Sequence, residues 1–387
     1  MRAPTGEEEG SVSIAGIELC WLDLTLERPV STARGAHAAR PVIVVRVLTS
    51  AGEGFGECAA LAEPTYGYEH AEGAWQVMES RLVPRLLAEP PGSPAGLMSA
   101  LAGLRGHRMA KAAIEMALLD ADLRAAGLSL AEHLGVSVDR VPAGAVVGRM
   151  ESQERLVEEV ARLADGGALR VRIKWSAGDP NEWLRAVRER FPELLLQVDA
   201  NGSYRPSGVA ELLEIDSLGL ACIEQPFGAD DLLAHAWLAE RISTPVCLDE
   251  SLSSPERVAE AVSLGACSLA CLKPACLGGF AAALEARETC LRAGVGMWCG
   301  GMFETSFARI ANAAFAALPG FVLPGDLSTE ARFVEGDLLG LSPEVPSPAG
   351  GMPPGTVRVH RGPGVAPPPD PSALARLASR REWFPAS

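Results

Sequence analysis

The sequence predicts an α/β protein in which a parallel β-barrel carries its helices outside and follows an α+β block. Three observations predict this fold. Strand-like apolar runs alternate with helical segments from about Val141 onward, several of these runs end in an ionisable residue, and the ionisable residues recur every 24 or 25 residues. A βα unit that returns to a parallel neighbouring strand takes roughly 25 to 30 residues. An open doubly wound sheet is the alternative, and it is disfavoured because no GxGxxG turn follows a first strand.

Length and composition fit a globular protein with an ample core: the chain has 387 residues, 48% of them hydrophobic and 21% charged. A net charge of −15 argues against nucleic acid or an anionic membrane as the main partner, because a basic footprint is missing. The first ten residues hold no apolar signal core, and no apolar run is long enough to cross a bilayer, so we expect a cytoplasmic protein. Nine cysteines without a CxxC pair predict buried thiols in place of disulfides.

The first part of the chain reads as antiparallel strands followed by helices. Residues 13–58 contain three strand-like runs, SIAGIELCWLDL, PVIVVRVLTS and GFGECAAL. Helical spacing of apolar residues follows over 72–87 and 109–135, where Gly127 and Gly135 end the turns. This α+β block precedes the repeating part and is not one of its units.

The repeating part begins with a strand at 141–148, a helix at 152–167 with Ser152 as N-cap, and a strand at 169–175. The helices expected after these cover 181–191, 206–215, 230–242, 254–265 and 280–294. After Phe321 comes the run LPGDLS, and then a Pro- and Gly-rich stretch at 342–355. A strand at 356–360 and a helix at 371–380 complete the chain, and we expect this tail to fold back on the N-terminal block.

Five charged residues end successive apolar runs and are expected to form one ring. They are Lys174, Asp199, Glu224, Asp249 and Lys273. Because the carboxyl ends of parallel strands meet at one face, these side chains should surround a single cavity. Three carboxylates with no His or Cys nearby favour a hard ion, so Mg²⁺ is predicted, with Mn²⁺ as the alternative. The competing interpretation is that each acid caps a helix or pairs with an arginine.

The two lysines lie on opposite sides of the three acids in strand order. Burial near a metal and another cation should lower the pKa of a lysine until it can act as a base. This predicts a reaction in which a metal binds a substrate carboxylate and one lysine removes the proton from the adjacent carbon. Alternatively, each lysine forms a structural ion pair. The amides at Gly300 and Gly301 could receive an anionic end of the substrate, or the glycines could serve only a bend.

These motifs resemble the enolase superfamily, in its muconate-lactonizing subgroup. The resemblance rests on Lys174, Asp199-Ala-Asn201, Glu224-Gln-Pro, Asp249-Glu-Ser, Lys273-Pro and GGMFET, and it extends over nearly the whole chain. Within the subgroup, the chain is most similar to the branch of o-succinylbenzoate synthase and N-succinylamino acid racemase. AGEGFGECAALAEPTYGYE looks like the pocket loop of that branch.

The resemblance implies a modified TIM barrel, (β/α)7β, with an α+β capping domain. The expected boundaries are 1–138 for the capping domain, 139–328 for the barrel, and 329–387 for a segment that returns to the capping domain. It also implies Mg²⁺ on the three acids, with Lys174 and Lys273 as catalytic residues. The substrate-binding residues we expect are Arg172, Asn201, Gly300, Gly301, Met302, Glu304, Tyr66 and Arg149.

Four positions depart from the family pattern around this ring. Arg172 stands at the first position of the family's KxK motif, and Val146 replaces a serine near the end of the first barrel strand. Arg149 stands where an apolar residue is expected, and Cys276 occupies a position where the branch often has arginine. These neighbours decide which carboxylate enters and whether one lysine or two transfer the proton.

We therefore predict an enzyme that removes a proton α to the carboxylate of a small molecule through an enediolate. Dehydration as in o-succinylbenzoate synthase is the first choice because of Cys276, and N-succinyl or N-acylamino acid racemisation is the alternative. A cycloisomerase or a dipeptide epimerase follows, and a catalytically silent barrel is the hypothesis of another class. We also expect a homo-oligomer.

Overall fold

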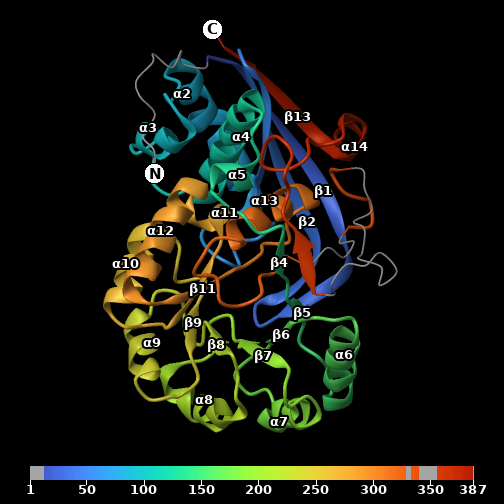
Figure 1. Cartoon of the computed structure of the whole chain (residues 1–387), viewed down its shortest axis with the longest axis vertical. Helices are drawn as coiled ribbons and strands as arrows, with labels where there is room; N and C mark the ends of the chain where they lie inside the picture. The colour runs from blue at the N-terminus through green and yellow to red at the C-terminus, as the bar shows by residue number, and fades with distance from the viewer. Residues whose placement is uncertain (1–12, 328–332, 340–354, 387) are drawn as a thin grey trace.

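The computed structural model describes residues 13–327, 333–339 and 355–386. The first residues and all but the end of the Pro- and Gly-rich stretch lie outside this part of the chain. In Figure 1 a sheet of long strands and its helices occupy the upper part, and a second sheet with surrounding helices occupies the lower part. The predicted α/β class, a barrel-type parallel sheet with an antiparallel capping sheet, is confirmed.

The antiparallel sheet has the strand order β13-β1-β2-β3. Its members are β1 (Ile14–Thr32), β2 (Gly35–Thr49), β3 (Gly52–Cys58) and β13 (Ala378–Pro385). The three N-terminal strands were predicted, whereas β13 was not: its first three residues were expected to continue a helix. That helix, α14 (Pro371–Leu377), ends earlier because β13 pairs with β1 from Gly16 to Leu22, and the ladder outweighs local helix propensity.

Helices cover one face of the antiparallel sheet. They are α1 (Ala71–Val77), a π-helical turn (Met78–Leu82), α2 (Val83–Ala88), a 3₁₀ turn (Pro94–Gly96), α3 (Leu97–Ala100), α4 (Arg108–Ala126) and α5 (Leu130–His133). Helix α4 lies unusually close to β3. A Cβ added at Gly56 would come within 1.9 Å of the Ala113 carbonyl oxygen, and one at Gly54 within 2.2 Å of that of Ala117. Glycines on the strand and alanines on the helix are therefore needed for this contact.

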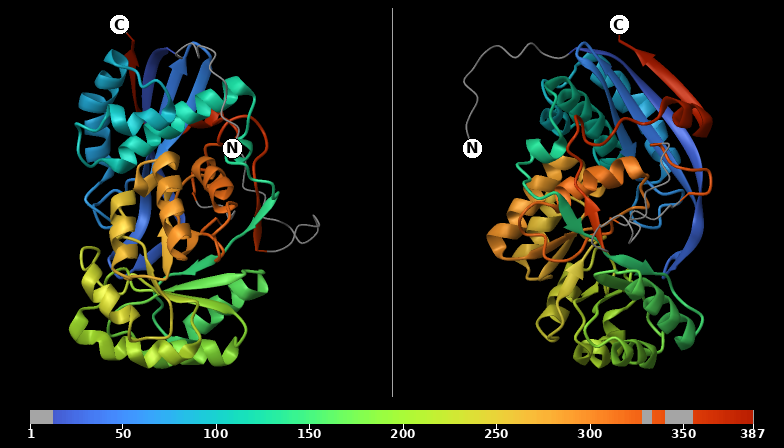
Figure 2. Two further views of the ribbon diagram at one scale, coloured as in Figure 1. Left: turned by 60° about the vertical axis from the view of Figure 1, so that its left-hand side comes forward. Right: turned by 45° about the vertical axis from the view of Figure 1, so that its right-hand side comes forward.

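The parallel sheet has the strand order β11-β10-β9-β8-β7-β6-β5. Its strands are β5 (Ala145–Val147), β6 (Arg170–Lys174), β7 (Leu195–Asp199), β8 (Cys222–Glu224), β9 (Val246–Leu248), β10 (Leu269–Leu272) and β11 (Gly296–Cys299). The connecting helices are α6 (Gln153–Asp165), α7 (Asn181–Arg190), α8 (Val209–Ile215), α9 (Leu232–Ala239), α10 (Pro255–Ser263), α11 (Pro274–Leu277), α12 (Phe280–Ala293) and α13 (Ser306–Ala316), with 3₁₀ turns at Pro206–Gly208 and Asp216–Leu218. Figure 2 shows these helices along the outer side of the strands. Ser152 caps α6 as predicted, because its hydroxyl accepts from the Arg155 amide.

Residues 321–326 close the gap between the two edge strands without forming a regular strand. The Val322 amide donates to Met297 O at 2.8 Å, and the Asp326 amide donates to Cys299 O at 2.9 Å. On the other side, the Gly144 amide donates to Gly325 O at 2.8 Å. This segment thus takes the place of the eighth barrel strand and carries Asp326 to the same edge as the other strand ends.

The strand expected at 141–148 is two strands. The first, β4 (Arg140–Pro142), pairs with β12 (Thr356–Arg358) in a separate two-stranded ribbon, and only β5 belongs to the barrel. Gly144 lies between them, and the glycine leaves room for Arg170, since an added Cβ would lie 2.5 Å from its guanidinium. Continuous apolar character did not reveal this change of partner.

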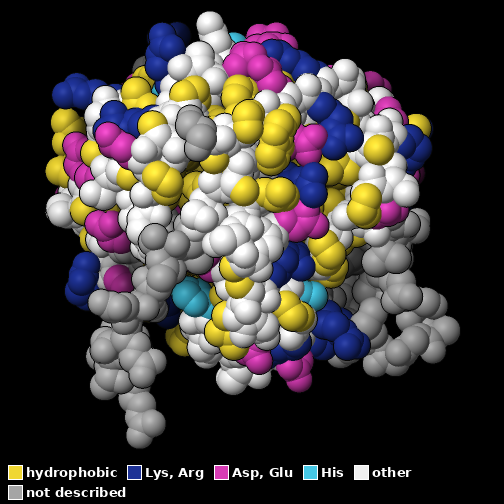
Figure 3. Space-filling model, turned by 90° about the horizontal axis from the view of Figure 1, so that it is seen from above, with side chains coloured by type: hydrophobic (Ala, Val, Ile, Leu, Met, Phe, Trp, Pro, Cys, Tyr) yellow, Lys and Arg dark blue, Asp and Glu magenta, His cyan; other side chains and the backbone are white. Residues whose placement is uncertain are grey.

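On the face that Figure 3 shows, Lys and Arg side chains are interspersed with Asp, Glu and hydrophobic ones. Among the described helices, none combines the length and the apolar character that a bilayer crossing requires. All nine cysteines are buried free thiols, which confirms the prediction of buried thiols in place of disulfides.

Glu115 joins the two parts of the molecule. This buried residue of α4 accepts hydrogen bonds from the amides of Phe280 at 3.1 Å and Ala281 at 3.0 Å, at the start of barrel helix α12. Burial raises the pKa of Glu115 to about 7. In the unfolded chain the Glu115 carboxyl group has its ordinary pKa of 4.5. Raising the pH from about 4.5 to about 7 therefore removes the proton of this group from the unfolded chain but not from the folded protein. The free energy of unfolding therefore falls over this window and levels off above it.

We predict that Glu115→Gln removes this contribution, because glutamine stays neutral while its carbonyl oxygen still accepts a hydrogen bond. Relative to the wild type, the variant should gain up to about 3 kcal/mol in the free energy of unfolding between pH 4.5 and pH 7.5. Urea denaturation across this range measures the difference. Parallel curves for the two proteins would show that Glu115 is not protonated on folding.

Candidate active site

A cavity of about 760 Å³ lies between the capping part and the barrel. Its walls come from the β1–β2 hairpin, the loop after β3, and the ends of barrel strands. Of the residues predicted from the sequence, nine line it: Tyr66, Arg149, Arg172, Lys174, Asn201, Asp249, Lys273, Gly301 and Met302. Asp199 and Glu224 are fully buried and are not among the lining residues.

Strand register brings the charged residues together. Lys174 pairs with Asp199 across β6 and β7, and Asp199 pairs with Glu224 across β7 and β8. Asp249 follows β9 directly, and Lys273 follows β10. The regular spacing in the sequence therefore corresponds to adjacency at one edge of the sheet.

Each lysine is held by a different carboxylate. Lys174 Nζ donates to Asp199 Oδ2 at 2.6 Å and to Asn201 Oδ1 at 3.1 Å. Lys273 Nζ donates to Asp249 Oδ2 at 2.7 Å and lies 4.3 Å from the centre of the Tyr66 ring. Both ammonium groups thus line the cavity from opposite sides of the acids.

Arg172 bridges two of the three acids. Its Nη1 donates to Asp199 Oδ2 at 2.8 Å and to Glu224 Oε1 at 2.9 Å, and its Nη2 donates to Asp326. The guanidinium carbon lies 5.1 Å from the centre of the Trp298 ring. In this arrangement the arginine partly neutralises the acids that were expected to bind a metal, as the competing interpretation of the acids requires.

The capping part reaches into the site through Tyr66 and Arg34. The Tyr66 hydroxyl donates to Asp249 Oδ1 at 2.8 Å. Arg34 donates through Nε to Asn201 O at 3.0 Å and lies 3.6 Å from Glu250 Oε1. Asn201 also donates to Glu250 from its side chain, at 3.1 Å. The orientation of the amide that holds Lys174 therefore depends on the hairpin.

Sequence reasoning missed four residues of this site. Asp326, Arg34, His37 and Glu250 either line the cavity or contact the predicted residues. The run LPGDLS was noted, but Asp326 falls outside the 25-residue rhythm. Glu250 follows Asp249 directly and could have been found from the acidic pair. The two hairpin residues carry no local signal because their contacts span more than a hundred positions.

The loop after β11 approaches Lys273 closely. A Cβ added at Gly300 would lie 2.4 Å from Cys271 Sγ and 2.5 Å from Lys273 Cε. Glu304 accepts from the Met302 amide at 2.8 Å and from Asn312 at 3.2 Å, and it does not line the cavity. Its predicted contact with substrate therefore stays a prediction, whereas its contacts here hold the loop.

Three of the residues that depart from the family pattern lie at different distances from the cavity. Val146 and Arg149 line the cavity, and Arg149 donates through Nε to Asp179 at 3.1 Å as part of an ion pair. Cys276 is buried in α11, in the same apolar cluster as Met302 and close to Tyr66. Arg149 thus enters the cavity wall with its charge already paired.

Burial and neighbouring charges shift the pKa values of several groups in this site. Burial raises the pKa of Glu224 above its ordinary value, and Asp199 and Asp249 raise it further, against the effect of Arg172. Burial also raises the pKa of Glu250, with Asp249 next in importance. Burial alone would lower the pKa of Lys273, but Asp249 outweighs this effect and raises it well above normal. The lowered lysine pKa expected from the sequence is therefore not found for Lys273 beside an ionised Asp249.

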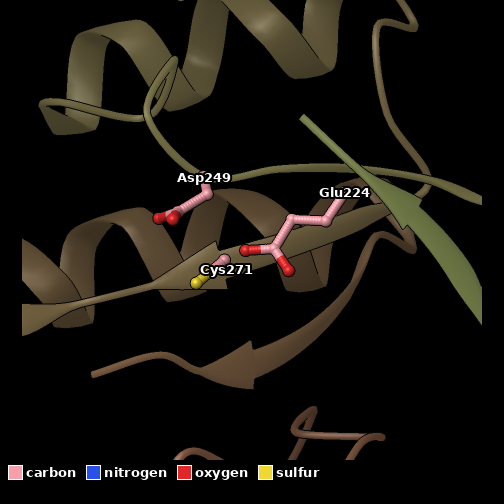
Figure 4. A group of neighbouring side chains, drawn as sticks. All are labelled: Glu224, Asp249 and Cys271. Carbon is pink, nitrogen blue, oxygen red and sulfur yellow. The ribbon is translucent and has the colours of Figure 1, made fainter. Parts of the chain in front are cut away.

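The donor set fits a divalent cation. Oxygen atoms of Glu224 and Asp249 and the sulfur of Cys271 all lie within 4.8 Å of one another, and Figure 4 shows the three side chains converging from neighbouring strands. Asp199 is linked to Glu224 because Arg172 Nη1 donates a hydrogen bond to each of them. Burial is the largest cause of the raised pKa of Glu224, with Asp199 and Asp249 adding to it, and a bound cation would favour the ionised form.

Comparisons with known proteins agree over the length of the chain. Residues 155–373 match the enolase C-terminal domain-like family, and residues 17–135 match the N-terminal domain of mandelate racemase and muconate lactonizing enzyme. An N-succinylamino acid racemase from an Amycolatopsis species is 42% identical over 96% of this chain and 100% of its own length. The o-succinylbenzoate synthase of Bacillus subtilis is 34% identical over 85% of this chain and 88% of its own length. A crystal structure of an enolase-superfamily member from Listeria innocua superposes with a TM-score of 0.90 at 30% identity, covering 97% of this chain and 100% of that one.

The contact at Gly300 yields a test of the site's geometry. We predict that Gly300→Ala displaces Lys273 and Cys271 and lowers the free energy of unfolding by about 1–3 kcal/mol, the usual cost of overpacking. Urea denaturation measures this loss. Gly228→Ala is the matched control, since an added Cβ there meets nothing within 4 Å. Equal stability of the two variants would contradict the close packing at Gly300.

Proposed function

The chain belongs to the enolase superfamily, in the family of mandelate racemase and muconate lactonizing enzyme, and on this premise we propose that it removes the proton α to a substrate carboxylate through an enediolate. The observation that carries the proposal is the pair of lysines that line one cavity, each on its own carboxylate. A carboxylate substrate placed between them would present its α-carbon to both ammonium groups.

Asp199, Glu224 and Asp249 are the residues that would hold Mg²⁺, with Mn²⁺ as the alternative. Members of the superfamily use Mg²⁺, and the three buried carboxylates offer the oxygen ligands this ion prefers. When bound, the ion would supply positive charge next to the substrate carboxylate. The same acids hold the two lysines and Arg172, so the charge of the pocket and the basicity of the lysines are linked.

Lys174 is assigned as the base that takes the α-proton. Its Nζ is aimed by Asp199 and by the Asn201 side chain, whose orientation is fixed in turn by Glu250. In dehydration Lys174 would then return the proton to the leaving hydroxyl, which departs as water. Lys273 would stabilise the enediolate from the opposite side with its ammonium group.

The composition of the chain supports these roles. Only three of its 34 basic residues are lysines, and two of these three are Lys174 and Lys273. Arginine can balance a carboxylate but cannot release a proton in a protein, whereas lysine can. In a chain that uses arginine almost everywhere, lysine at both sides of the cavity points to proton transfer.

Dehydration as in o-succinylbenzoate synthase remains the first reaction we propose, and N-succinylamino acid racemisation is the second candidate. Two observations favour the second: both lysines reach the cavity, and the 42% identical relative is named an N-succinylamino acid racemase. The two reactions share their first step. They differ in whether Lys273 gives a proton to the opposite face of the enediolate.

We further propose that the protein works in the cytoplasm as a homo-oligomer on a small carboxylate substrate. The nine buried free thiols suit a reducing compartment.

A series of Lys→Arg substitutions tests the proton-transfer roles. We predict that Lys174→Arg lowers turnover by roughly 10²–10⁴-fold, because the charge remains but the base is lost. The measurements are formation of o-succinylbenzoate and exchange of the α-proton of each enantiomer of an N-succinylamino acid in deuterium oxide. If the enzyme is a two-base racemase, Lys273→Arg should abolish exchange of one enantiomer and leave exchange of the other. If Lys174 is the only base, Lys273→Arg should not separate the two enantiomers in this way.

The control for this series is Lys111→Arg. Lys111 is the third lysine; it lies in α4 and donates to the Leu104 carbonyl oxygen, away from the cavity. Its variant should keep full turnover and rule out a general effect of the substitution. Wild-type turnover in Lys174→Arg would show that another group is the base.

Metal binding can be measured without substrate. We predict that Glu224→Gln weakens Mg²⁺ binding at least tenfold in isothermal titration calorimetry, because a charged oxygen ligand is lost. Glu115→Gln, which removes a buried acid outside the pocket, should bind Mg²⁺ as the wild type does. Unchanged affinity in Glu224→Gln would contradict the ligand assignment.

A further inference from the structure

A buried thiol faces the acids at the carboxyl ends of the barrel strands. Cys271 lies on β10, two residues before Lys273, and only 2% of its surface is exposed. Its sulfur occupies the space left by Gly300, where a Cβ would approach it to 2.4 Å. No hydrogen bond of this sulfur is found within the part of the chain that the structure describes. The thiol is thus a buried polar group with an unused lone pair beside two carboxylates.

We propose that Glu224, Asp249 and Cys271 form a mixed carboxylate and thiolate site for a thiophilic divalent cation of the zinc and cadmium type. The inference rests on the proposed function, because two of these ligands are shared with the proposed Mg²⁺ site. It adds a third ligand of a different chemical kind.

The geometry carries this assignment. The ligand atoms of the three residues lie within 4.8 Å of one another. Glu224 ends β8, Asp249 directly follows β9 and Cys271 lies in β10, and these three strands are neighbours in the sheet. Around a zinc ion, with bonds of about 2.0–2.3 Å, neighbouring ligand atoms are on the order of 3.5 Å apart. Side-chain movements of about 1 Å would bring the three ligand atoms to the separation that a bound zinc ion requires. Figure 4 shows the sulfur of Cys271 next to the carboxyl groups of Glu224 and Asp249.

The chemistry of the ligands sets the selectivity. Thiolate favours soft and borderline ions, whereas Mg²⁺ prefers oxygen alone. On binding, a sulfur–metal bond forms, the thiol proton leaves to water, and no oxidant or reductant is required. A pocket with a thiol in this position should therefore hold Zn²⁺ or Cd²⁺ more tightly than Mg²⁺, so that only a large excess of Mg²⁺ competes for the shared carboxylates.

Cadmium alone is the probe, added to the full chain and followed by ultraviolet absorption. We expect one equivalent of Cd²⁺ to produce a thiolate-to-cadmium charge-transfer band in the wild type. Cys271→Ser should abolish the band. Cys290→Ser is the matched control: it removes an equally buried thiol in α12, outside the pocket, and should leave the band unchanged.

Two further measurements keep the result interpretable. Excess Mg²⁺ should raise the Cd²⁺ concentration at half-saturation of the wild type at least tenfold. This measurement uses the wild type alone and so does not depend on the folding of any variant. Glu224→Gln should weaken Cd²⁺ binding by a similar factor. The site is overturned if the wild type gives no band, if Cys271→Ser keeps it, or if Mg²⁺ and Glu224→Gln leave the titration unaltered. Exchange of the α-proton by the Mg²⁺-loaded wild type is measured separately from the Cd²⁺ band, so failure of the thiol site is distinct from failure of the proposed function.

Discussion

The constraint on which the site depends is that charges buried by strand register must neutralise one another. Five cations and five acids form one linked group around the carboxyl ends of the barrel strands: Arg34 from the hairpin, Arg170 from the start of β6, Arg172, Lys174, Lys273, Asp199, Glu224, Asp249, Glu250 and Asp326. Leaving one such ion unpaired in the interior would cost several kcal/mol. Each of them has a partner within hydrogen-bond or ion-pair distance.

Much of this arrangement could be predicted from the sequence because parallel strands convert a linear period into adjacency. The spacing of about 25 residues from Lys174 to Lys273 corresponds to successive strands, and each charged residue lies at or just after a strand end. Asp326 could not be found in this way. The segment that carries it closes the barrel through single bridges and has no strand pattern of its own. The split of 141–148 into β4 and β5 escaped for a similar reason, since β12 comes more than two hundred residues later.

The capping part determines more of the site than its sequence suggests. Arg34 and Tyr66 lie on the hairpin and on the loop after β3, yet they contact Asn201 and Asp249 at the ends of barrel strands. His37, on the same hairpin, packs with its ring centre 5.6 Å from that of Phe303 in the loop after β11. Residues that aim the two lysines thus come from both parts of the molecule, and their contacts span too many positions for local patterns to reveal. Movement of the hairpin would change the surroundings of both lysines together.

Arg172 balances the charge of the acids, whereas proton transfer is the role proposed for Lys174. A planar guanidinium can bond Asp199, Glu224 and Asp326 at once, which a compact ammonium at this position could do only with poorer geometry. Burial by itself would raise the pKa of Asp326, but Arg172 and Arg170 lower it to about 2, so this acid stays ionised and anchors the guanidinium. Because Arg172 keeps its charge, a change of charge on this side of the cavity falls to Lys174, which shares Asp199 with it. The arginine that departs from the family pattern therefore leaves the proposed proton transfer on this side of the cavity to Lys174.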